Sequence, residues 1–172
     1  MTYILPMVAA VENDTWKETP ILMTDTLTEA QEASFTDLPF SKNVRRAVAE
    51  QGWSIPTPIQ ALALPELLEG NDVVGLAQTG SGKTAAFSIP LIEGIDRKAR
   101  GVQALVLVPT RELASQAATE ISNLSRHEPV RPLVLCGGTN IGPQIKTLKN
   151  RSNSVVVGTP GRILDHLQRG TL

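Results

Sequence analysis

Apolar residues form short, dense runs from residue 72 onward, and each run is followed by a longer stretch with helical spacing. Four runs predict strands, at residues 73–77, 102–108, 133–136 and 155–157. The run at 102–108 is almost continuously apolar, which is typical of a strand buried on both faces. Alternating strands and helices predict an α/β fold built on a parallel sheet.

Helix signals occupy the remaining stretches. Ser41 is placed to cap a helix that closes at Gly52, and Thr57 followed by Pro58 is placed to cap a second helix running to about residue 68. Further helices are predicted from Gly82 to about residue 92, from Thr110 to residue 124, and weakly over 144–149. A last helix starts at Thr159-Pro160, and its inward positions are predicted to be Ile163, Leu164 and Leu167.

Residues 1–34 differ from the rest of the chain. They hold six acidic residues and one basic residue and show no sustained periodicity of either kind. We expect a mobile acidic extension, with a short helical piece over residues 27–33, ahead of a single ordered domain at 35–172. The apolar start lacks a basic region and is broken by Pro6, so it is not read as a signal peptide.

Composition narrows the function classes. Residues 35–172 carry a net charge of +4, which is compatible with a nucleic-acid partner. Cys136 is the only cysteine, so an intramolecular disulfide or a cysteine metal cluster is excluded. The two histidines, His127 and His166, are expected at the surface or half-buried. No apolar run has the length of a membrane span, and a cytoplasmic location without membrane contact is expected.

The most informative stretch is Ala77-Gln78-Thr79-Gly80-Ser81-Gly82-Lys83-Thr84, between a predicted strand and a predicted helix. Gly80 and Gly82 allow backbone amides to curl around phosphates, and the following helix N-terminus adds further amides. Lys83 would reach the β- and γ-phosphates, and the Thr84 hydroxyl would hold Mg²⁺. The strict P-loop pattern begins with glycine where this chain has Ala77. The alternative is a flexible Gly-Ser turn with an ordinary lysine, but the strand and helix context favours a phosphate site.

Four further stretches give the chain a family resemblance. They are Gly52-Trp53-Ser54-Ile55-Pro56-Thr57-Pro58-Ile59-Gln60 with Phe35 upstream, Pro109-Thr110-Arg111-Glu112-Leu113-Ala114, Gly137-Gly138, and Thr159-Pro160-Gly161-Arg162. Together with the P-loop, in this order, they resemble the DEAD-box RNA helicases over residues 35–172, most closely the bacterial cold-shock members. The family's own P-loop begins with alanine, so Ala77 fits it. The resemblance implies an incomplete RecA-like domain that uses ATP and Mg²⁺ and binds RNA.

The resemblance also implies roles for single residues around the nucleotide. Gln60 would read adenine, because its amide offers a donor and an acceptor together, and Thr57 belongs to the same motif. Phe35 would stack on the base. The alternative for Gln60 is a solvated helix position, and the alternative for Phe35 is a core position.

Contacts to single-stranded RNA are implied for Pro109, Thr110, Arg111, Gly137, Gly138, Thr159, Pro160, Gly161 and Arg162. These residues would meet the sugar-phosphate backbone, so little sequence preference is expected. Thr110 and Thr159 are also expected to act as helix N-caps, which is compatible with the RNA role. Glu112 is expected to pair locally and Asp165 to be solvated, so neither is a candidate catalytic acid.

The Asp-Glu-Ala-Asp sequence that defines the family does not occur in these 172 residues, nor do the family's Ser-Ala-Thr motif and second domain. We therefore expect a chain that carries the phosphate cradle without completing catalysis. The alternative is a non-catalytic nucleotide- or RNA-binding or interaction module, while an unrelated P-loop kinase or transporter ATPase is excluded by the other motifs. Without the family's later strands, the P-loop strand would expose an edge unless something covers it. The RNA substrate and the oligomeric state stay open.

Overall fold

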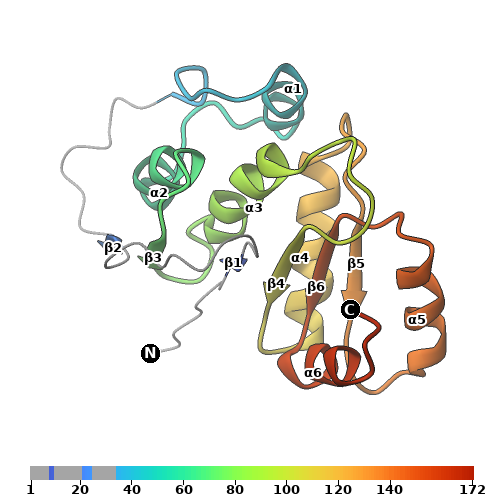
Figure 1. Ribbon diagram of the computed structural model, residues 1–172. Helices are drawn as coiled ribbons and strands as arrows, with labels where there is room; N and C mark the ends of the chain where they lie inside the picture. The colour runs from blue at the N-terminus through green and yellow to red at the C-terminus, as the bar shows by residue number, and fades with distance from the viewer. Residues whose placement is uncertain (1–7, 10–20, 25–33) are drawn as a thin grey trace.

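The computed structural model describes residues 8–9, 21–24 and 34–172. Two strands and a helix come first, and from residue 58 onward helices and strands alternate (Figure 1). The strands are β1 (Val8–Ala9), β2 (Ile21–Thr24), β3 (Val73–Leu76), β4 (Ala104–Leu107), β5 (Pro132–Leu135) and β6 (Val155–Gly158). The helices are α1 (Lys42–Glu50), α2 (Pro58–Leu68), α3 (Lys83–Gly94), α4 (Arg111–Leu124), α5 (Ile141–Lys149) and α6 (Pro160–Gln168).

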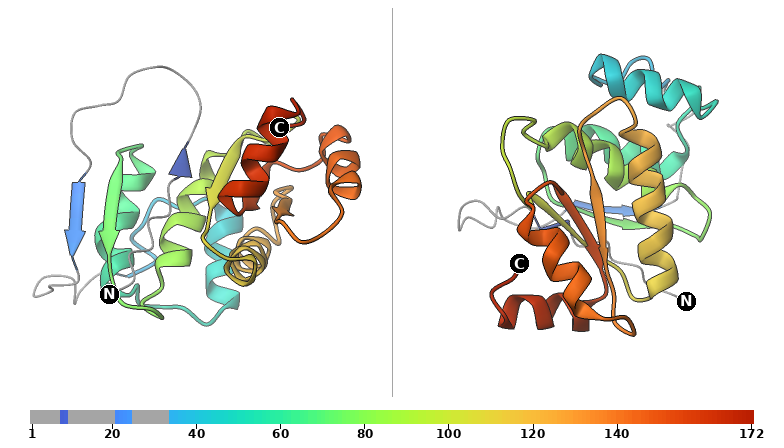
Figure 2. Two further views of the ribbon diagram at one scale, coloured as in Figure 1. Left: turned by 90° about the horizontal axis from the view of Figure 1, so that it is seen from below. Right: turned by 90° about the vertical axis from the view of Figure 1, so that its right-hand side faces the viewer.

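The strands of the described chain form two sheets. The larger sheet has the order β1-β4-β6-β5, with β4, β6 and β5 parallel and β1 antiparallel to β4. The P-loop strand β3 pairs instead with β2, in parallel, in a separate two-stranded sheet (Figure 2). The predicted parallel α/β fold is thus confirmed, although β3 is not hydrogen-bonded to the three-stranded parallel core.

Strand β6 lies in the interior of the protein, because all of its residues are buried. Val155 and Val157 pack into a cluster with residues of α3 and α4, whereas Val156 packs on the opposite side with Leu148 of α5 and Ile163 of α6. This alternation follows from the two-residue period of a strand and gives a sheet with helices on both faces.

The prediction that the run at 102–108 is buried on both faces is wrong for most of the run. Only Val106 is fully buried within β4, and its neighbours in the strand are half-buried. The physical reason is the place of β4 in the sheet. Its outer neighbour is the two-residue strand β1, so β4 lies near the sheet margin and β6 takes the central place.

The predicted helix starts are confirmed, with one exception. The Ser41 hydroxyl accepts from the Val44 amide at 3.3 Å, and the Thr110 hydroxyl accepts from the Leu113 amide at 3.2 Å. Helix α5 begins three residues earlier than the predicted residue 144, because the Asn140 side chain caps it by accepting from the Gly142 amide at 2.9 Å.

The inward face predicted for the last helix is partly wrong. Ile163 is buried, but Leu164 and Leu167 are 54% and 52% exposed. His166 takes the inward position and is fully buried, which also corrects the expectation that it is at the surface or half-buried. His127 is half-buried as expected and lies beside Glu50, with Nε2 2.9 Å from the carboxylate.

Two strands, β1 and β2, occur within residues 1–34, where the sequence predicted none. The helical piece predicted for residues 27–33 lies outside the described residues. Among the described residues, no helix is both long enough and apolar enough to cross a bilayer.

Candidate functional site

The loop between β3 and α3 has the backbone that the P-loop interpretation requires. Gly80 and Gly82 adopt φ values of +82° and +89°, in the left-handed region that favours glycine. Gly82 is the N-cap residue of the twelve-residue helix α3, and Lys83 and Thr84 are its first two residues. Gln78, Thr79 and Gly80 are exposed, while Ala77 and residues 81–84 are half-buried. The loop therefore presents its tip to solvent directly ahead of a helix N-terminus.

Lys83 is folded back over this loop. Its ammonium donates to the carbonyl oxygens of Ala77 and Gln78, each at 2.5 Å. These contacts hold the charged group at the loop, beside the amides that precede α3. A phosphate chain binding there would give the ammonium charged oxygens in place of neutral carbonyls, which makes stronger hydrogen bonds.

Gln60 connects helix α2 to the P-loop. Its side chain is 4% exposed, which excludes the solvated alternative. The amide nitrogen donates to the Gly82 carbonyl at 3.1 Å, and the amide oxygen accepts from the Thr57 backbone at 2.9 Å. Both polar ends are thus engaged within the protein. The adenine-reading role of Gln60 stays a prediction, and it would require these two contacts to be exchanged for the base.

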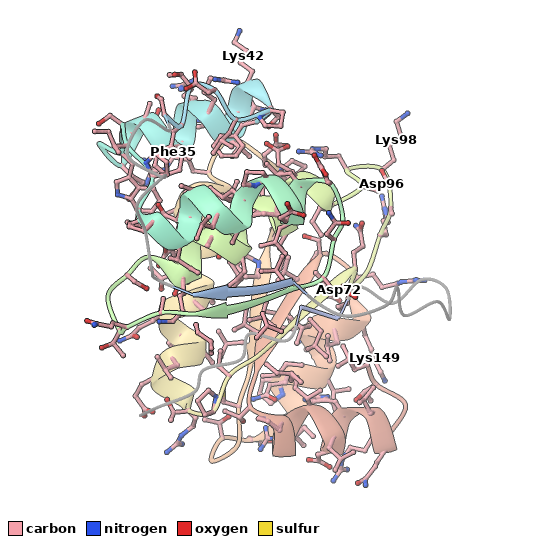
Figure 3. The ribbon with its side chains drawn as sticks, turned by 90° about the vertical axis from the view of Figure 1, so that its left-hand side faces the viewer. Phe35, Lys42, Asp72, Asp96, Lys98 and Lys149 are labelled. Atoms are coloured by element: carbon pink, nitrogen blue, oxygen red, sulfur yellow. The ribbon has the colours of Figure 1, made fainter. Side chains whose placement is uncertain are left out.

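Phe35 lies in the hydrophobic core beside α1 and α2 (Figure 3). Its ring is 4% exposed and packs against Trp53, at a centroid distance of 6.3 Å, and against Phe40, at 6.2 Å. Stacking on a base needs an open ring face. The structure therefore favours the core alternative for Phe35 over the expected stacking role.

Two buried hydroxyls, one in the P-loop and one next to it, are available to a bound nucleotide. Among the described residues, three buried side-chain oxygens have no hydrogen-bond partner: Thr57 Oγ1 and Ser81 Oγ at the P-loop, and Ser88 Oγ within α3. A buried hydroxyl without a partner costs free energy unless a ligand or water satisfies it. Thr57 Oγ1 also lies close to Gly82, 3.1 Å from where a β-carbon would stand. Residues from α2 and from the loop thus offer polar groups to the same small region.

The implied RNA-contact residues come together at the carboxyl ends of parallel strands. Pro109 and Thr110 follow β4 and are exposed, Gly137 and Gly138 follow β5, and residues 159–162 follow β6. The Thr159 amide donates to the Leu135 carbonyl at 3.2 Å, which ties the last two loops together. The three loops therefore lie side by side, as the parallel topology requires.

Arg111 lies across the glycine pair. Its guanidinium donates to the Gly137 carbonyl at 3.3 Å, and a β-carbon at Gly138 would collide with the guanidinium nitrogen Nη1. Gly138 also has φ of +80°. The glycine is thus required by both its backbone conformation and the approach of Arg111, whose side chain stays exposed.

Arg162 is more deeply engaged than a free phosphate ligand would be. Its side chain is 11% exposed and donates to Gln144 Oε1 at 2.9 Å and to the Thr139 carbonyl at 3.0 Å. Thr159 stands at the N-cap position of α6, but its hydroxyl makes no capping hydrogen bond, in contrast to Thr110. The expected side-chain capping role is therefore correct for Thr110 only.

Neither Gln144 nor His166 was predicted to belong to the site, yet the structure places them at the centre of this cluster. Gln144 donates to the Cys136 carbonyl at 3.2 Å and to Thr139 Oγ1 at 3.1 Å. His166 Nε2 lies 3.0 Å from Gln144 Oε1, and Nδ1 lies 2.8 Å from Thr171 Oγ1. Burial lowers the pKa of His166, and the nearby Arg162 charge lowers it further. The one signal in the sequence is that His166 lies three residues after Ile163, on the same face of the helix, which would have predicted burial of His166.

The carboxylates of this region are occupied by local partners. The Asp165 carboxylate accepts from Arg169 at 2.6 Å, and this bond lowers the pKa of Asp165. Hydrogen bonds with its own backbone amide and with Thr110 lower the pKa of Glu112. Glu112 thus pairs locally, as predicted, while Asp165 is part-exposed and paired with Arg169. Among the described residues, no group of three or more His, Cys, Asp or Glu is placed to hold a metal.

The fold and the loop define a P-loop α/β domain, and comparison with known proteins identifies its family. The sequence matches the DEAD/DEAH box helicase family over residues 57–172. It is 49% identical over 142 residues to the ATP-dependent RNA helicase DeaD of Klebsiella pneumoniae, covering 82% of this chain and 22% of that protein. It is 48% identical over 139 residues to the DEAD-box ATP-dependent RNA helicase CshA of Geobacillus kaustophilus, covering 81% and 30%.

Solved structures agree. A DEAD box protein from the hyperthermophile Methanococcus jannaschii matches with a TM-score of 0.75 and 44% identity, over 81% of this chain and 38% of that one. The chain therefore belongs to the DEAD/DEAH box helicase family, and its relatives include the bacterial DeaD and CshA types. It spans less than a third of the length of the two curated relatives described above.

Proposed function

We propose that this chain is the ATP- and RNA-binding part of an ATP-dependent RNA helicase. In this proposal, the P-loop at the start of α3 holds the nucleotide phosphates, and the loops after β4, β5 and β6 hold the backbone of single-stranded RNA. The observation that carries the proposal is the hydrogen bond from the Gln60 side chain to the Gly82 carbonyl. This bond joins α2, which carries the residue proposed to read adenine, to the P-loop.

The nucleotide part rests on the chemistry of the P-loop. Residues 77–84 would surround the phosphates with backbone amides and the Lys83 ammonium, and Thr84 would hold Mg²⁺ through the nucleotide. The unpartnered hydroxyls of Thr57 and Ser81 would gain partners. Mg²⁺ would neutralise phosphate charge, while the protein orients the chain of phosphates.

The RNA part rests on three loops that share one edge of the sheet. Exposed Arg111 and the amides near Gly137, Gly138 and residues 159–161 suit phosphate and sugar oxygens. Contacts to phosphate and sugar carry no base information, so binding should show little sequence preference. The 172 residues contain no Asp-Glu-Ala-Asp sequence, so binding without hydrolysis is proposed for this stretch of chain.

A fluorescent adenine nucleotide tests the first half of the proposal. Binding to the 172-residue chain is compared for the wild type, Lys83→Ala and Gln60→Ala, with Lys98→Ala as a matched control because Lys98 is exposed and remote from the loop (Figure 3). Both site variants should lose at least about tenfold in affinity, which corresponds to about 1.4 kcal/mol. Unlabelled ATP should compete better than GTP. Equal affinity of all four proteins would overturn the nucleotide site.

A labelled single-stranded oligouridine tests the second half. Arg111→Ala should weaken binding about three- to tenfold, as the loss of a charged phosphate contact would, whereas Arg100→Ala should leave it unchanged. A chain that binds nucleotide but not RNA at low salt would reduce the proposal to a nucleotide-binding module. RNA binding without nucleotide binding would instead reduce the proposal to a non-catalytic RNA-binding module.

A further inference from the structure

His166 is the most buried titratable side chain of the described residues that the proposed function leaves unused, with no exposed surface. It lies on α6, one helical turn from Arg162. It contacts two other segments, at Thr171 after α6 and at Gln144 of α5. A buried imidazole with a defined partner on each ring nitrogen is held in one orientation.

The hydrogen-bond network fixes which ring nitrogen carries the proton. Arg162 has only donors, so the Gln144 atom that it contacts at 2.9 Å is the amide oxygen. The same oxygen lies 3.0 Å from His166 Nε2, which must therefore donate to it. A neutral imidazole then has Nδ1 as an acceptor, and the Thr171 hydroxyl at 2.8 Å supplies the donor, in place of its other acceptor, the His166 carbonyl at 3.1 Å.

Gln144 links His166 to the loop after β5 by hydrogen bonds. With its oxygen held by His166 and Arg162, its amide nitrogen points to the Cys136 carbonyl at 3.2 Å and to Thr139 Oγ1 at 3.1 Å. Arg162 holds the same loop through the Thr139 carbonyl. The loop flanked by these contacts contains Gly137 and Gly138.

We infer that His166 is a positioning residue, which through Gln144 holds Arg162 and the glycine loop at residues 137–139 in one arrangement. The functional part of this inference rests on the proposed RNA site, because the two groups positioned belong to its β5 and β6 loops. The structural part is independent of RNA, since it concerns one tautomer and the order of one loop.

The structural part is tested by nuclear magnetic resonance and amide hydrogen exchange. The imidazole nitrogen shifts should show a neutral His166 protonated at Nε2, and protonation at Nδ1 would overturn the inference. His166→Leu removes the donor, whereas His166→Gln places an amide nitrogen near the Nε2 position. Exchange over residues 136–141 should rise about three- to tenfold in His166→Leu, the size expected for one neutral hydrogen bond. It should rise less than about twofold in His166→Gln.

A matched control separates this effect from general loss of stability. His127→Leu removes the other histidine, which lies beside Glu50 and away from the loop, and it should leave exchange at 136–141 unchanged. If His166→Leu unfolds the chain, His166→Gln and Gln144→Leu decide the matter: the first should keep the loop protected and the second should not. Equal exchange in these two variants would overturn the inference.

Single-stranded oligouridine binding then tests the functional part. His166→Leu should weaken RNA binding about three- to tenfold while nucleotide affinity stays within about twofold, and His166→Gln should restore RNA binding. A parallel loss of both affinities would show a general structural role and contradict the inference. If the wild type binds no RNA, the proposed RNA function fails, and the tautomer and exchange results still decide whether His166 positions the loop.

Discussion

At the scale of single residues, Gly82 carries two requirements at once. Its φ of +89° favours glycine, and a β-carbon there would stand 2.4 Å from Gln60 Nε2. A residue with a side chain would thus strain the backbone and break the contact between α2 and the P-loop. Gly80 shares the positive φ, but nothing lies within 4 Å of the position of its β-carbon.

Gly82→Ala is therefore expected to lower both stability and nucleotide affinity. The left-handed conformation alone should cost about 1–2 kcal/mol of unfolding free energy. Displacing Gln60 should lower adenine-nucleotide affinity about tenfold or more. Urea unfolding and fluorescent-nucleotide titration measure the two effects. Gly94→Ala is the control, because Gly94 ends α3 without positive φ and has no atom near its β-carbon position. Unchanged affinity in Gly82→Ala would show that the contact with Gln60 is dispensable.

Phe35→Leu separates the two interpretations of the aromatic ring. Leucine keeps an apolar side chain in the core, so the loss of unfolding free energy should stay below about 1.5 kcal/mol. Because the ring is covered by Trp53 and Phe40, nucleotide affinity should change less than about twofold. A stacked base would instead lose about 1–3 kcal/mol of binding free energy, and a loss of that size in the titration would restore the stacking role.

At the level of elements, the apolar residues of α6 predict the wrong inward face for that helix. Its leucines, Leu164 and Leu167, are the most apolar candidates for an inward face, yet they are exposed. The inward positions are taken by Ile163, His166 and the stem of Arg162, because the neighbouring part of α5 offers the polar partner Gln144. A buried polar pair selects its face by hydrogen bonding, and hydrophobicity alone gives no sign of it.

Burial of His166 predicts a dependence of stability on pH. Its folded pKa is lowered below the reference value of 6.5, so the unfolded chain binds the proton more tightly. Its contribution is fully present above pH 6.5 and is lost as the pH falls through that value toward the folded pKa. The charges that act on it are Arg162, Asp165 and Arg169.

Urea unfolding of the wild type and His166→Gln between pH 7.5 and 5 measures this contribution. The wild type should lose more stability on acidification than the variant, and the difference should develop below pH 6.5. His127 is present in both proteins, so its titration cancels in the comparison. Parallel curves would show that His166 takes up a proton as easily in the folded chain as in the unfolded one.

Local chemistry explains which elements could be predicted. Ser41 and Thr110 mark helix starts through hydrogen bonds within one turn, and Gly82 marks one through its positive φ, so the sequence displays them directly. The P-loop and the motif positions follow for the same reason. By contrast, the Gln60–Gly82 bond and the His166–Gln144 bond each join residues 22 positions apart. Such contacts depend on how elements pack, and no local pattern encodes them.

In the molecule as a whole, the described strands form two separate sheets. The P-loop strand β3 is not paired with the larger sheet, and among the described strands β2 alone pairs with it, along residues 73–76. The expectation that something must cover an edge of this strand is thus met by residues 21–24. No local pattern in residues 21–24 points to β3, because pairing between distant strands depends on which edges the rest of the fold leaves open.

Replacing Ile21–Thr24 with Gly-Ser-Gly-Ser should therefore destabilise the chain around its nucleotide loop. Glycine disfavours a strand, and the uncovered edge of β3 would become open to other chains. A loss of about 1 kcal/mol would lower the melting temperature by about 2–4 °C in a domain of this size. Light scattering should show aggregation at lower protein concentration. The same replacement at residues 12–15 keeps the chain length and serves as the control. If both proteins melt at one temperature, β2 contributes nothing to stability and the P-loop strand stands without it.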